Sequence, residues 1–209
     1  FEERELHTAL EMALYRHKME RERAKLHLDE HELLERTVEA SIKVLSKILS
    51  IAEPQSYEFG QKLRDYMKVC AAAMNIENAW ELETAALLCR IGYVTFPAIL
   101  IQKMRAGMAL TPGEKDTSMR LPEYGRNILN NFPRLEGVSR IVYYQNKNFN
   151  GTGIPAGSGG GVNIPLGSRI LKVLIDLVQF EAEGMSKGKA LEEIRKAVGI
   201  YDPKLLDDL

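Results

Sequence analysis

The residues best suited to acid–base or metal chemistry are confined to the start of the chain. All four histidines, His7, His17, His27 and His31, lie within the first 31 of the 209 residues. Histidine is the usual proton shuttle near neutral pH and a common ligand of transition metals. The sequence therefore excludes an imidazole base, shuttle or ligand from the remainder of the chain.

Two of these histidines have the spacing of zinc ligands. His27 and His31 share one face of a helix, and Glu30 adjoins them, as in an inverted zinc-peptidase motif. Such a site needs a third ligand from a folded catalytic domain, whereas this pair lies in a highly charged segment. We expect exposed histidines, or histidines on a helix seam, and no bound zinc.

Two further features could bind or react with a phosphate. Seven of the seventeen residues from 151 to 167 are glycine, but no Gly-Lys-Ser or Gly-Lys-Thr ends the stretch, so we predict a surface loop rather than a phosphate cradle. Cys89 has Arg90 beside it, which would lower the pKa of the thiol. Without a histidine partner, Cys89 is expected to be a packed cysteine.

A long helix opens the chain and would position whatever follows. Residues 1–36 carry ten acidic and seven basic side chains, and neither Pro nor Gly occurs before Pro54. Apolar residues alternate here at spacings of four and three, a pattern typical of a two-stranded coiled coil. The predicted dimer seam includes Leu10, Leu14, Ala24, Leu28, Val38 and Ile42, and continues at Leu45 and Leu49. A second line competes with it: Met12, Met19, Leu26, Leu33 and Ala40.

Shorter helices are predicted for the rest of the chain. Their expected ranges are about 56–74, 78–91, 97–104, 116–131, 134–146, 166–182 and 186–198, followed by a short turn that opens at Asp202. Asn78, with Glu81 three residues later, is expected to cap the second of these ranges. Alternation of Val, Ile and Thr is absent, so the predicted fold class is all-α.

Composition excludes several classes of partner. The formal net charge is −1, so no broad basic field attracts nucleic acid or an anionic membrane. Cys70 and Cys89 are the only cysteines, too few for a disulfide framework, and no apolar run is long enough to span a bilayer. We expect a cytoplasmic protein with no cofactor and no direct contact with nucleic acid or membrane.

Six short segments, in this order, carry a family resemblance: Ala86–Pro97, Leu110–Pro112, Leu121–Leu129, Asn148–Pro155, Ile164–Ile170 and Tyr201–Pro203. Together they resemble the HD-GYP branch of the HD phosphohydrolases. The resemblance implies an all-helical bundle. In intact members, two or three metal ions support the hydrolysis of cyclic di-GMP.

The resemblance fails at the metal ligands. The family uses a histidine on an early helix, a His-Asp pair, a histidine before Pro-Glu, a His-His pair and a later aspartate. The matching positions here are Phe59, Cys89, Arg90, Leu121, Gln145, Asn146 and Ile175. Since Arg90 would repel a divalent cation and the apolar side chains would fill its space, the resemblance implies a dry pocket without catalysis.

Two other readings remain open. Arg90 and Lys147 could hold an anion, which would make the chain a sensor that binds cyclic dinucleotides without cutting them. A divergent phosphohydrolase could instead use a relocated site built from Asp65, Asp176, Glu123 or the amino-terminal histidines.

The opening segment is similar to the last helix of receiver domains and the linker that leaves them. We therefore predict a linker helix over residues 1–36, following an upstream receiver domain, and a degenerate HD-GYP-like domain over residues 37–209. The predicted function is the non-catalytic output region of a bacterial two-component response regulator. It would act through a homodimer and an unknown protein partner.

Overall fold

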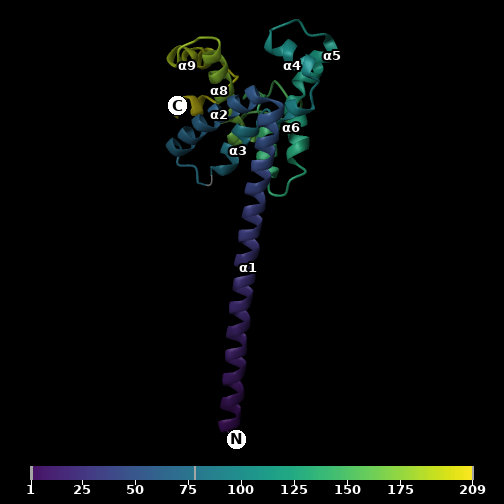
Figure 1. Cartoon of the computed structure of the whole chain (residues 1–209). Coiled ribbons are helices and arrows are strands. Elements are labelled where there is room, and N and C mark those ends of the chain that lie inside the picture. Colours follow the sequence, from purple (N-terminus) through teal and green to yellow (C-terminus); the bar gives the residue numbers. More distant parts are fainter. Residues whose placement is uncertain (1, 78, 209) are drawn as a thin grey trace. The chain divides into compact units, whose positions relative to one another are not determined.

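The computed structural model describes the backbone of residues 2–77 and 79–208 (Figure 1). The side chains of residues 2–11, 13, 14, 24, 27, 29, 31 and 208 lie outside the described part. Contacts divide the chain into two units, Phe1–Ser41 and Ile42–Leu209.

Helix α1 (Glu2–Ala52) supplies the described residues of the first unit and the beginning of the second. Its large described apolar side chains before residue 38 are exposed, among them Met19, Leu26 and Leu33. His17 is exposed as well, while the side chains of His7, His27 and His31 lie outside the described residues. The prediction of a coiled coil in this segment therefore stays a prediction.

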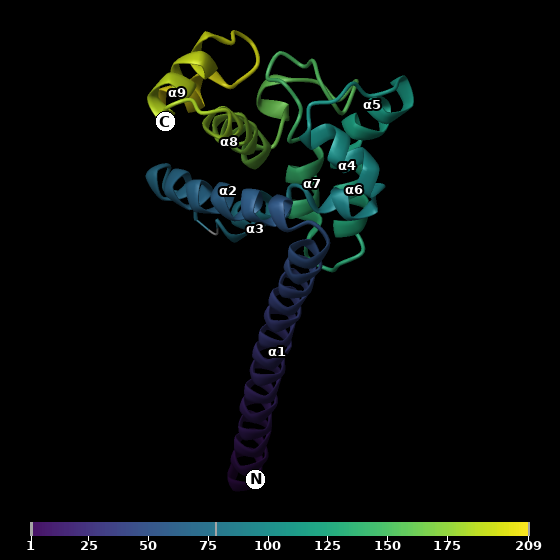
Figure 2. The same cartoon turned by 45° about the horizontal axis from the view of Figure 1, so that its top comes forward.

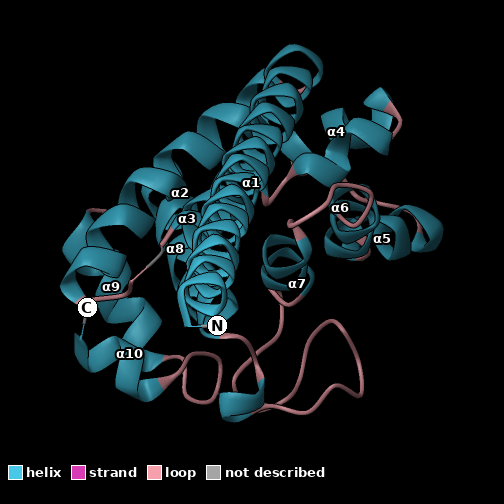
Figure 3. Ribbon diagram, turned by 90° about the horizontal axis from the view of Figure 1, so that it is seen from below, coloured by secondary structure: helices cyan, strands magenta, loops and turns pink. Residues whose placement is uncertain are grey.

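The second unit is built from short helices that follow α1 (Figure 3). They are α2 (Pro54–Ala73), α3 (Trp80–Leu88), the 3-10 helix η1 (Ile91–Thr95), α4 (Ala98–Arg105), α5 (Pro112–Met119), α6 (Leu121–Leu129), α7 (Glu136–Tyr143), the 3-10 helix η2 (Gly161–Asn163), α8 (Leu166–Ala182), α9 (Lys187–Lys196) and α10 (Pro203–Asp208). The only β pairing recorded among the described residues is an isolated bridge between Lys147 and Gly153. The predicted all-α class is confirmed.

The core forms where α2, α3, α7 and α8 pack together (Figure 2). Leu63 and Met67 of α2 are fully buried, on the face that the helical spacing predicts. Gly60 permits the close approach of α2 to α3, because a Cβ atom there would lie 2.2 Å from the backbone oxygen of Leu87. This packing fixes the end of α3, from which the candidate site begins.

A smaller apolar cluster lies under α4. Phe96, Leu100 and Ile101 are buried there, and Leu121 and Tyr124 of α6 pack against them. Edge-to-face contacts between the Phe96 ring and its aromatic neighbours support this packing, with a centroid distance of 5.5 Å to Tyr124. The cluster therefore sets the position of the start of α6.

The predicted helix over 116–131 is wrong in its extent, because two helices, α5 and α6, meet at Arg120. Thr111 and Glu114 form a capping box with Pro112 as the first helical residue, so the Thr-Pro-Gly segment starts α5 rather than interrupting the helices. Asn78, the predicted cap of the preceding range, lies outside the described residues, and α3 begins at Trp80. No described helix is both long and apolar enough to cross a membrane.

Candidate functional site

The positions that match the family's metal ligands lie at the ends or on the inner faces of several helices of the second unit. Phe59 is on α2, and Cys89 and Arg90 form the turn that follows α3. Leu121 opens α6, Gln145 and Asn146 follow α7, and Ile175 is on α8. Described contacts connect Phe59 with Arg90 and Cys89 with Gln145. We call this group the degenerate centre, after the prediction that its positions have lost the family's metal ligands.

A guanidinium group stacked on a phenyl ring occupies one side of the degenerate centre. The Cζ atom of Arg90 lies 3.4 Å from the centroid of the Phe59 ring, and 6.0 Å from that of Tyr93. A cation over an aromatic face is held by the ring quadrupole, and the contact strengthens when water is excluded. Phe59, which the sequence matched to an early-helix histidine, thus holds the guanidinium of Arg90 against its ring.

Cys89 is part of the packing and not a reactive thiol. Its side chain is buried, and burial raises the pKa of the thiol to about 12, against the weaker opposing effect of Arg90. At neutral pH the sulfur stays protonated, whereas nucleophilic attack and metal binding need the thiolate. The predicted packed cysteine is confirmed.

Gln145 connects the end of α7 to the end of α3. Its side chain is buried, and its Nε2 donates a hydrogen bond of 3.0 Å to the backbone oxygen of Cys89. A buried amide that satisfies a turn carbonyl stabilises the local backbone. Asn146, the other half of the expected histidine pair, is exposed.

The remaining apolar positions have separate environments. Leu121 belongs to the cluster of Phe96, Leu100 and Ile101, and Ile175 is half-buried on α8. The expectation that both side chains fill the space left by a metal remains untested, since no described contact joins either to Phe59 or Arg90.

Lys147 forms a hydrogen bond with the glycine-rich loop. Its side chain is buried, and its Nζ donates a hydrogen bond of 2.7 Å to the backbone oxygen of Pro155. The predicted surface loop is present, and several of its glycines, including Gly151 and Gly153, have positive φ. Because its ammonium group is engaged by a loop carbonyl, Lys147 would have to break this contact to bind an anion, whereas Arg90 would not.

The carboxylates considered for a relocated metal site are dispersed or already paired. Asp176 accepts hydrogen bonds from Lys172 at 2.8 Å and from the Tyr201 hydroxyl at 2.7 Å. Glu123 accepts two from Arg120, and Asp65 is exposed on α2. Within the described part of the chain, no three His, Cys, Asp or Glu side chains are grouped so that they could hold a metal ion.

The two candidate seams of α1 differ in burial. On the first, Leu28 is exposed and Ile42 half-buried, while Val38, Leu45 and Leu49 are buried. The structure accounts for the burial of Leu45 and Leu49 without a partner, because both lie in the core of the second unit. The side chains of Leu10, Leu14 and Ala24 lie outside the described residues.

The second line of α1 stays exposed wherever its side chains are described. Met12, Met19, Leu26 and Leu33 are exposed, as is Ala40. In the sequence, the second inward position of the same heptad register is filled in the second unit by Val44 and Ile51, which are 53% and 70% exposed. The residues of this register from Met12 to Ile51 are called the outer line below.

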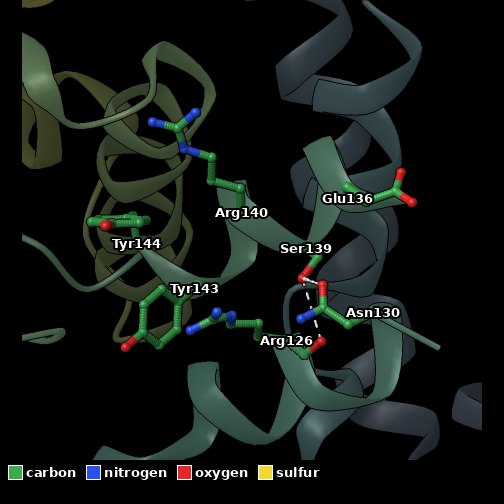
Figure 4. A pocket seen from close by; sticks show the side chains of 7 residues that line it. All are labelled: Arg126, Asn130, Glu136, Ser139, Arg140, Tyr143 and Tyr144. Carbon is green, nitrogen blue, oxygen red and sulfur yellow. Dashed lines mark hydrogen bonds between the residues drawn. The ribbon is translucent and has the colours of Figure 1, made fainter. Parts of the chain in front are cut away.

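Sequence reasoning missed a pocket between α6 and α7. Its lining residues are Arg126, Asn130, Glu136, Ser139, Arg140, Tyr143 and Tyr144 (Figure 4). Arg126 lies in the segment Leu121–Leu129, and the other lining residues lie outside the six segments. Only the packing of α6 against α7 brings the Arg126 Cζ atom to within 4.4 Å of the centroid of the Tyr143 ring. The high amphipathicity of both helices was the one available signal, and it indicates a buried face but not a pocket.

Comparison with solved structures gives relatives of the same fold. The HDG"Y"P protein Bd1817 from Bdellovibrio bacteriovorus superposes with a TM-score of 0.59 at 17% identity over 74% of this chain, which spans about half (51%) of that protein. The HD domain of the L. monocytogenes phosphodiesterase PgpH, in complex with cyclic-di-AMP, gives 0.60 at 14% identity, covering 78% of this chain and 90% of that one.

A cyclic GMP-AMP specific phosphodiesterase of V. cholerae gives a TM-score of 0.59 at 21% identity, over 78% of this chain and 45% of that one. At such identities these likenesses establish the fold. A search of curated proteins found no match. A family model described as an HD domain matches residues 43–205. Because that match covers most of the chain, the protein belongs to the HD domain family.

Proposed function

We propose that the chain is the non-catalytic output region of a bacterial two-component response regulator. In this proposal the HD domain transmits a signal through protein contacts and dimer geometry instead of hydrolysing a cyclic dinucleotide. An upstream receiver domain supplies the signal through α1, and a separate protein receives it.

The observation that carries the proposal is the stack of Arg90 on Phe59, at 3.4 Å. Phosphodiester hydrolysis by metal ions needs cations that generate hydroxide and neutralise the charge of the phosphate. Here a fixed guanidinium lies beside a buried thiol that stays protonated and a buried amide. These groups repel or fail to bind a divalent cation, so the same fold would serve recognition rather than catalysis.

Self-association through the outer line fits this role. A long helix whose amino-terminal part is exposed depends on packing for the stability of that part. The outer line offers Leu26 and Leu33 at 67% and 66% exposure and Val44 and Ile51 closer to the core of the second unit. A parallel pair of such helices would pass a rotation or register change from one end of α1 to the other.

One specific observation favours a second candidate, a sensor that binds an anion without cutting it. In the described part of the chain, the side chain of Arg90 makes aromatic contacts but no recorded hydrogen bond or ion pair, so its guanidinium donors are available. The PgpH relative is recorded in complex with cyclic-di-AMP. A binder of this kind would use Arg90 as its anchor.

Metal content and turnover test the proposal directly. Protein purified without chelators is analysed for iron, manganese and zinc, and then assayed with cyclic di-GMP, cyclic-di-AMP and cyclic GMP-AMP in the presence of manganese or iron(II). We expect less than one metal ion per chain and no turnover above that of the Arg90→Met variant. Stoichiometric metal together with metal-dependent turnover would refute it.

Calorimetry with the same three cyclic dinucleotides separates the two candidates. Binding that is lost in Arg90→Met would support the sensor, and no heat up to about a millimolar ligand would leave the output role as the better account. The Arg195→Ala variant, which removes an exposed arginine on α9, is the matched control.

A further inference from the structure

A single residue joins α1 to α2. Glu53 follows the last turn of α1 and precedes Pro54, the first residue of α2 (Figure 2). Its backbone N–H donates a hydrogen bond of 2.8 Å to the oxygen of Leu49, and its own oxygen accepts one of 3.0 Å from the N–H of Tyr57. Since both helices are hydrogen-bonded to the same residue, a rotation or tilt of the end of α1 moves the backbone of Glu53. This residue and the two turns beside it are called the joint below.

The side chain of Glu53 connects the joint to α4. Its Oε2 atom pairs with Nη2 of Arg105, the last residue of α4, and accepts a hydrogen bond of 3.4 Å from Ser56 Oγ. The side chain of Glu53 is 12% exposed, and that of Arg105 is 38% exposed. Salt and water screen a partly buried ion pair less than an exposed one, so this contact holds the end of α4 against the joint. The contact between Glu53 and Arg105 is called the joint pair below.

Tyr93 is close to both the joint pair and the degenerate centre. It packs on the apolar cluster under α4, with its ring centroid 5.4 Å from that of Phe96. Burial raises the pKa of the Tyr93 hydroxyl, and the charges of Arg90 and of the joint pair act on it as well. The same ring lies 6.0 Å from the Cζ atom of Arg90. A change in the joint pair therefore reaches a side chain that contacts Arg90.

A second route leads from the joint to Arg90. Phe59 follows Glu53 on α2, and its ring holds the guanidinium of Arg90 at 3.4 Å. One route thus passes along α2 to Phe59, and the other passes through Arg105 and α4 to Tyr93. Because the two routes meet at Arg90, a shift of the joint relative to α4 changes the aromatic surfaces that hold the guanidinium.

We propose that Glu53 and Arg105 are positioning residues that couple the end of α1 to the seating of Arg90 in the degenerate centre. With the joint pair formed, α4 and α2 keep Tyr93 and Phe59 in fixed positions next to the guanidinium. A displacement of the end of α1 that breaks the pair releases Tyr93 and loosens the degenerate centre. The use of this coupling for signalling rests on the proposed output function, but the coupling itself can be measured without a receiver domain or a ligand.

The two buried cysteines report the coupling in the full chain. Cys89 precedes Arg90 in the degenerate centre, whereas Cys70 lies on α2. Both are labelled with a thiol reagent at several urea concentrations below the unfolding midpoint, and mass spectrometry of the digested protein gives the rate for each cysteine. Only opening of the surrounding structure exposes either thiol. Local opening of the degenerate centre accelerates the labelling of Cys89 alone, whereas a loss of global stability accelerates both.

Breaking the joint pair should open the degenerate centre selectively. In Glu53→Gln and in Arg105→Gln, labelling of Cys89 is expected to accelerate by about three- to tenfold relative to that of Cys70. The double variant should show the effect of one single variant, because the two side chains act as one unit. Arg105→Lys keeps the charge and should recover part of the original ratio of rates. The variants of Arg105, the more exposed of the two residues, supply the test if Glu53→Gln does not fold.

Glu114→Gln is the matched control. Lys103 Nζ lies 2.6 Å from Glu114 Oε1, so this substitution breaks another ion pair of α4, one that does not involve the joint. The ratio of the two labelling rates should stay that of the original chain. In the reverse direction, Arg90→Met should accelerate hydrogen exchange in peptides that contain the joint and leave that of α9 unchanged, because a coupling between two sites is reciprocal.

Several results would overturn the proposal. They are equal acceleration of Cys89 and Cys70 in the single variants, no acceleration of either cysteine, additive effects in the double variant, and an equal effect of Glu114→Gln. Unchanged hydrogen exchange at the joint in a folded Arg90→Met variant would also contradict it. Metal-dependent hydrolysis of a cyclic dinucleotide would refute the output function and leave these rates unaffected, so the two failures are distinguishable.

Discussion

The choice between the two seams of α1 can be decided by a reciprocal pair of substitutions. In the register of the outer line, Leu26 faces the partner helix and Leu28 faces solvent. In the register of the predicted dimer seam, called the first seam here, Leu28 faces the partner helix instead. The two leucines are 67% and 69% exposed in the single chain. Leu26→Lys and Leu28→Lys therefore change the same residue type, charge and exposed area, and helix propensity changes little.

The exposed fractions give the expected size of the effect. Full burial of a leucine stabilises by about 1.5–3 kcal/mol, so burial of the two thirds of Leu26 that is exposed contributes about 1–2 kcal/mol per chain. A symmetric dimer loses this contribution twice, about 2–4 kcal/mol. The dissociation constant is then expected to rise by about 30- to 700-fold in Leu26→Lys, while Leu28→Lys should behave like the original chain.

Sedimentation equilibrium over a wide range of protein concentrations measures these constants. A large effect of Leu28→Lys with none of Leu26→Lys would assign the dimer to the first seam and refute the reasoning about the outer line. A chain that stays monomeric at every concentration would refute self-association itself. Circular dichroism at 222 nm verifies that both variants keep their helix content.

Three further predictions concern the folded HD domain. Cys89 should not react with Ellman's reagent at pH 8 until the protein is unfolded, because burial holds the thiol pKa near 12. The hydrogen bond from Lys103 lowers the pKa of Glu114 to about 2, so its stabilising effect is complete above about pH 5 and is lost as the pH falls toward 2. The urea midpoint of the original chain should therefore exceed that of Glu114→Gln at pH 6, and the difference between the two proteins should be smaller at pH 3. Gly60→Ala should destabilise by about 1–3 kcal/mol, since its Cβ would meet backbone of α3, whereas Gly188→Ala, with open space around it, should stabilise slightly in urea titrations.

Periodicity predicts the parts of this fold in which one face of a helix meets the core. The buried face of α2 at Leu63, Met67 and Cys70 follows from spacing alone, as does the loop after residue 150 from its glycines. The start of α5 could have been found from the capping box of Thr111 and Glu114, and the start of a separate α6 from Pro122, which lies in its first turn.

Tertiary packing determines the other contacts of the site, and no local sequence pattern predicts them. The spacing of Phe59 and Arg90 does not reveal that their side chains stack, because the contact depends on how α2 meets the turn after α3. A lysine such as Lys147 is usually exposed, but here its side chain is buried and donates a hydrogen bond to the backbone oxygen of Pro155. Leu45 and Leu49 fit a coiled-coil seam equally well in sequence, and only their burial in the second unit shows that they are core residues.

The arrangement of apolar residues near the end of α1 also limits how this domain can be joined to other domains. Leu45 and Leu49 face the core, while Val44 and Ile51 are exposed on an adjacent face. An α-helix turns by about 100° per residue, so one residue inserted before Ile42 would rotate every upstream side chain relative to these exposed residues. Under the proposed output role, chimeric proteins that exchange the proposed upstream receiver domain should respond in the same direction only when the helix is lengthened or shortened by whole heptads.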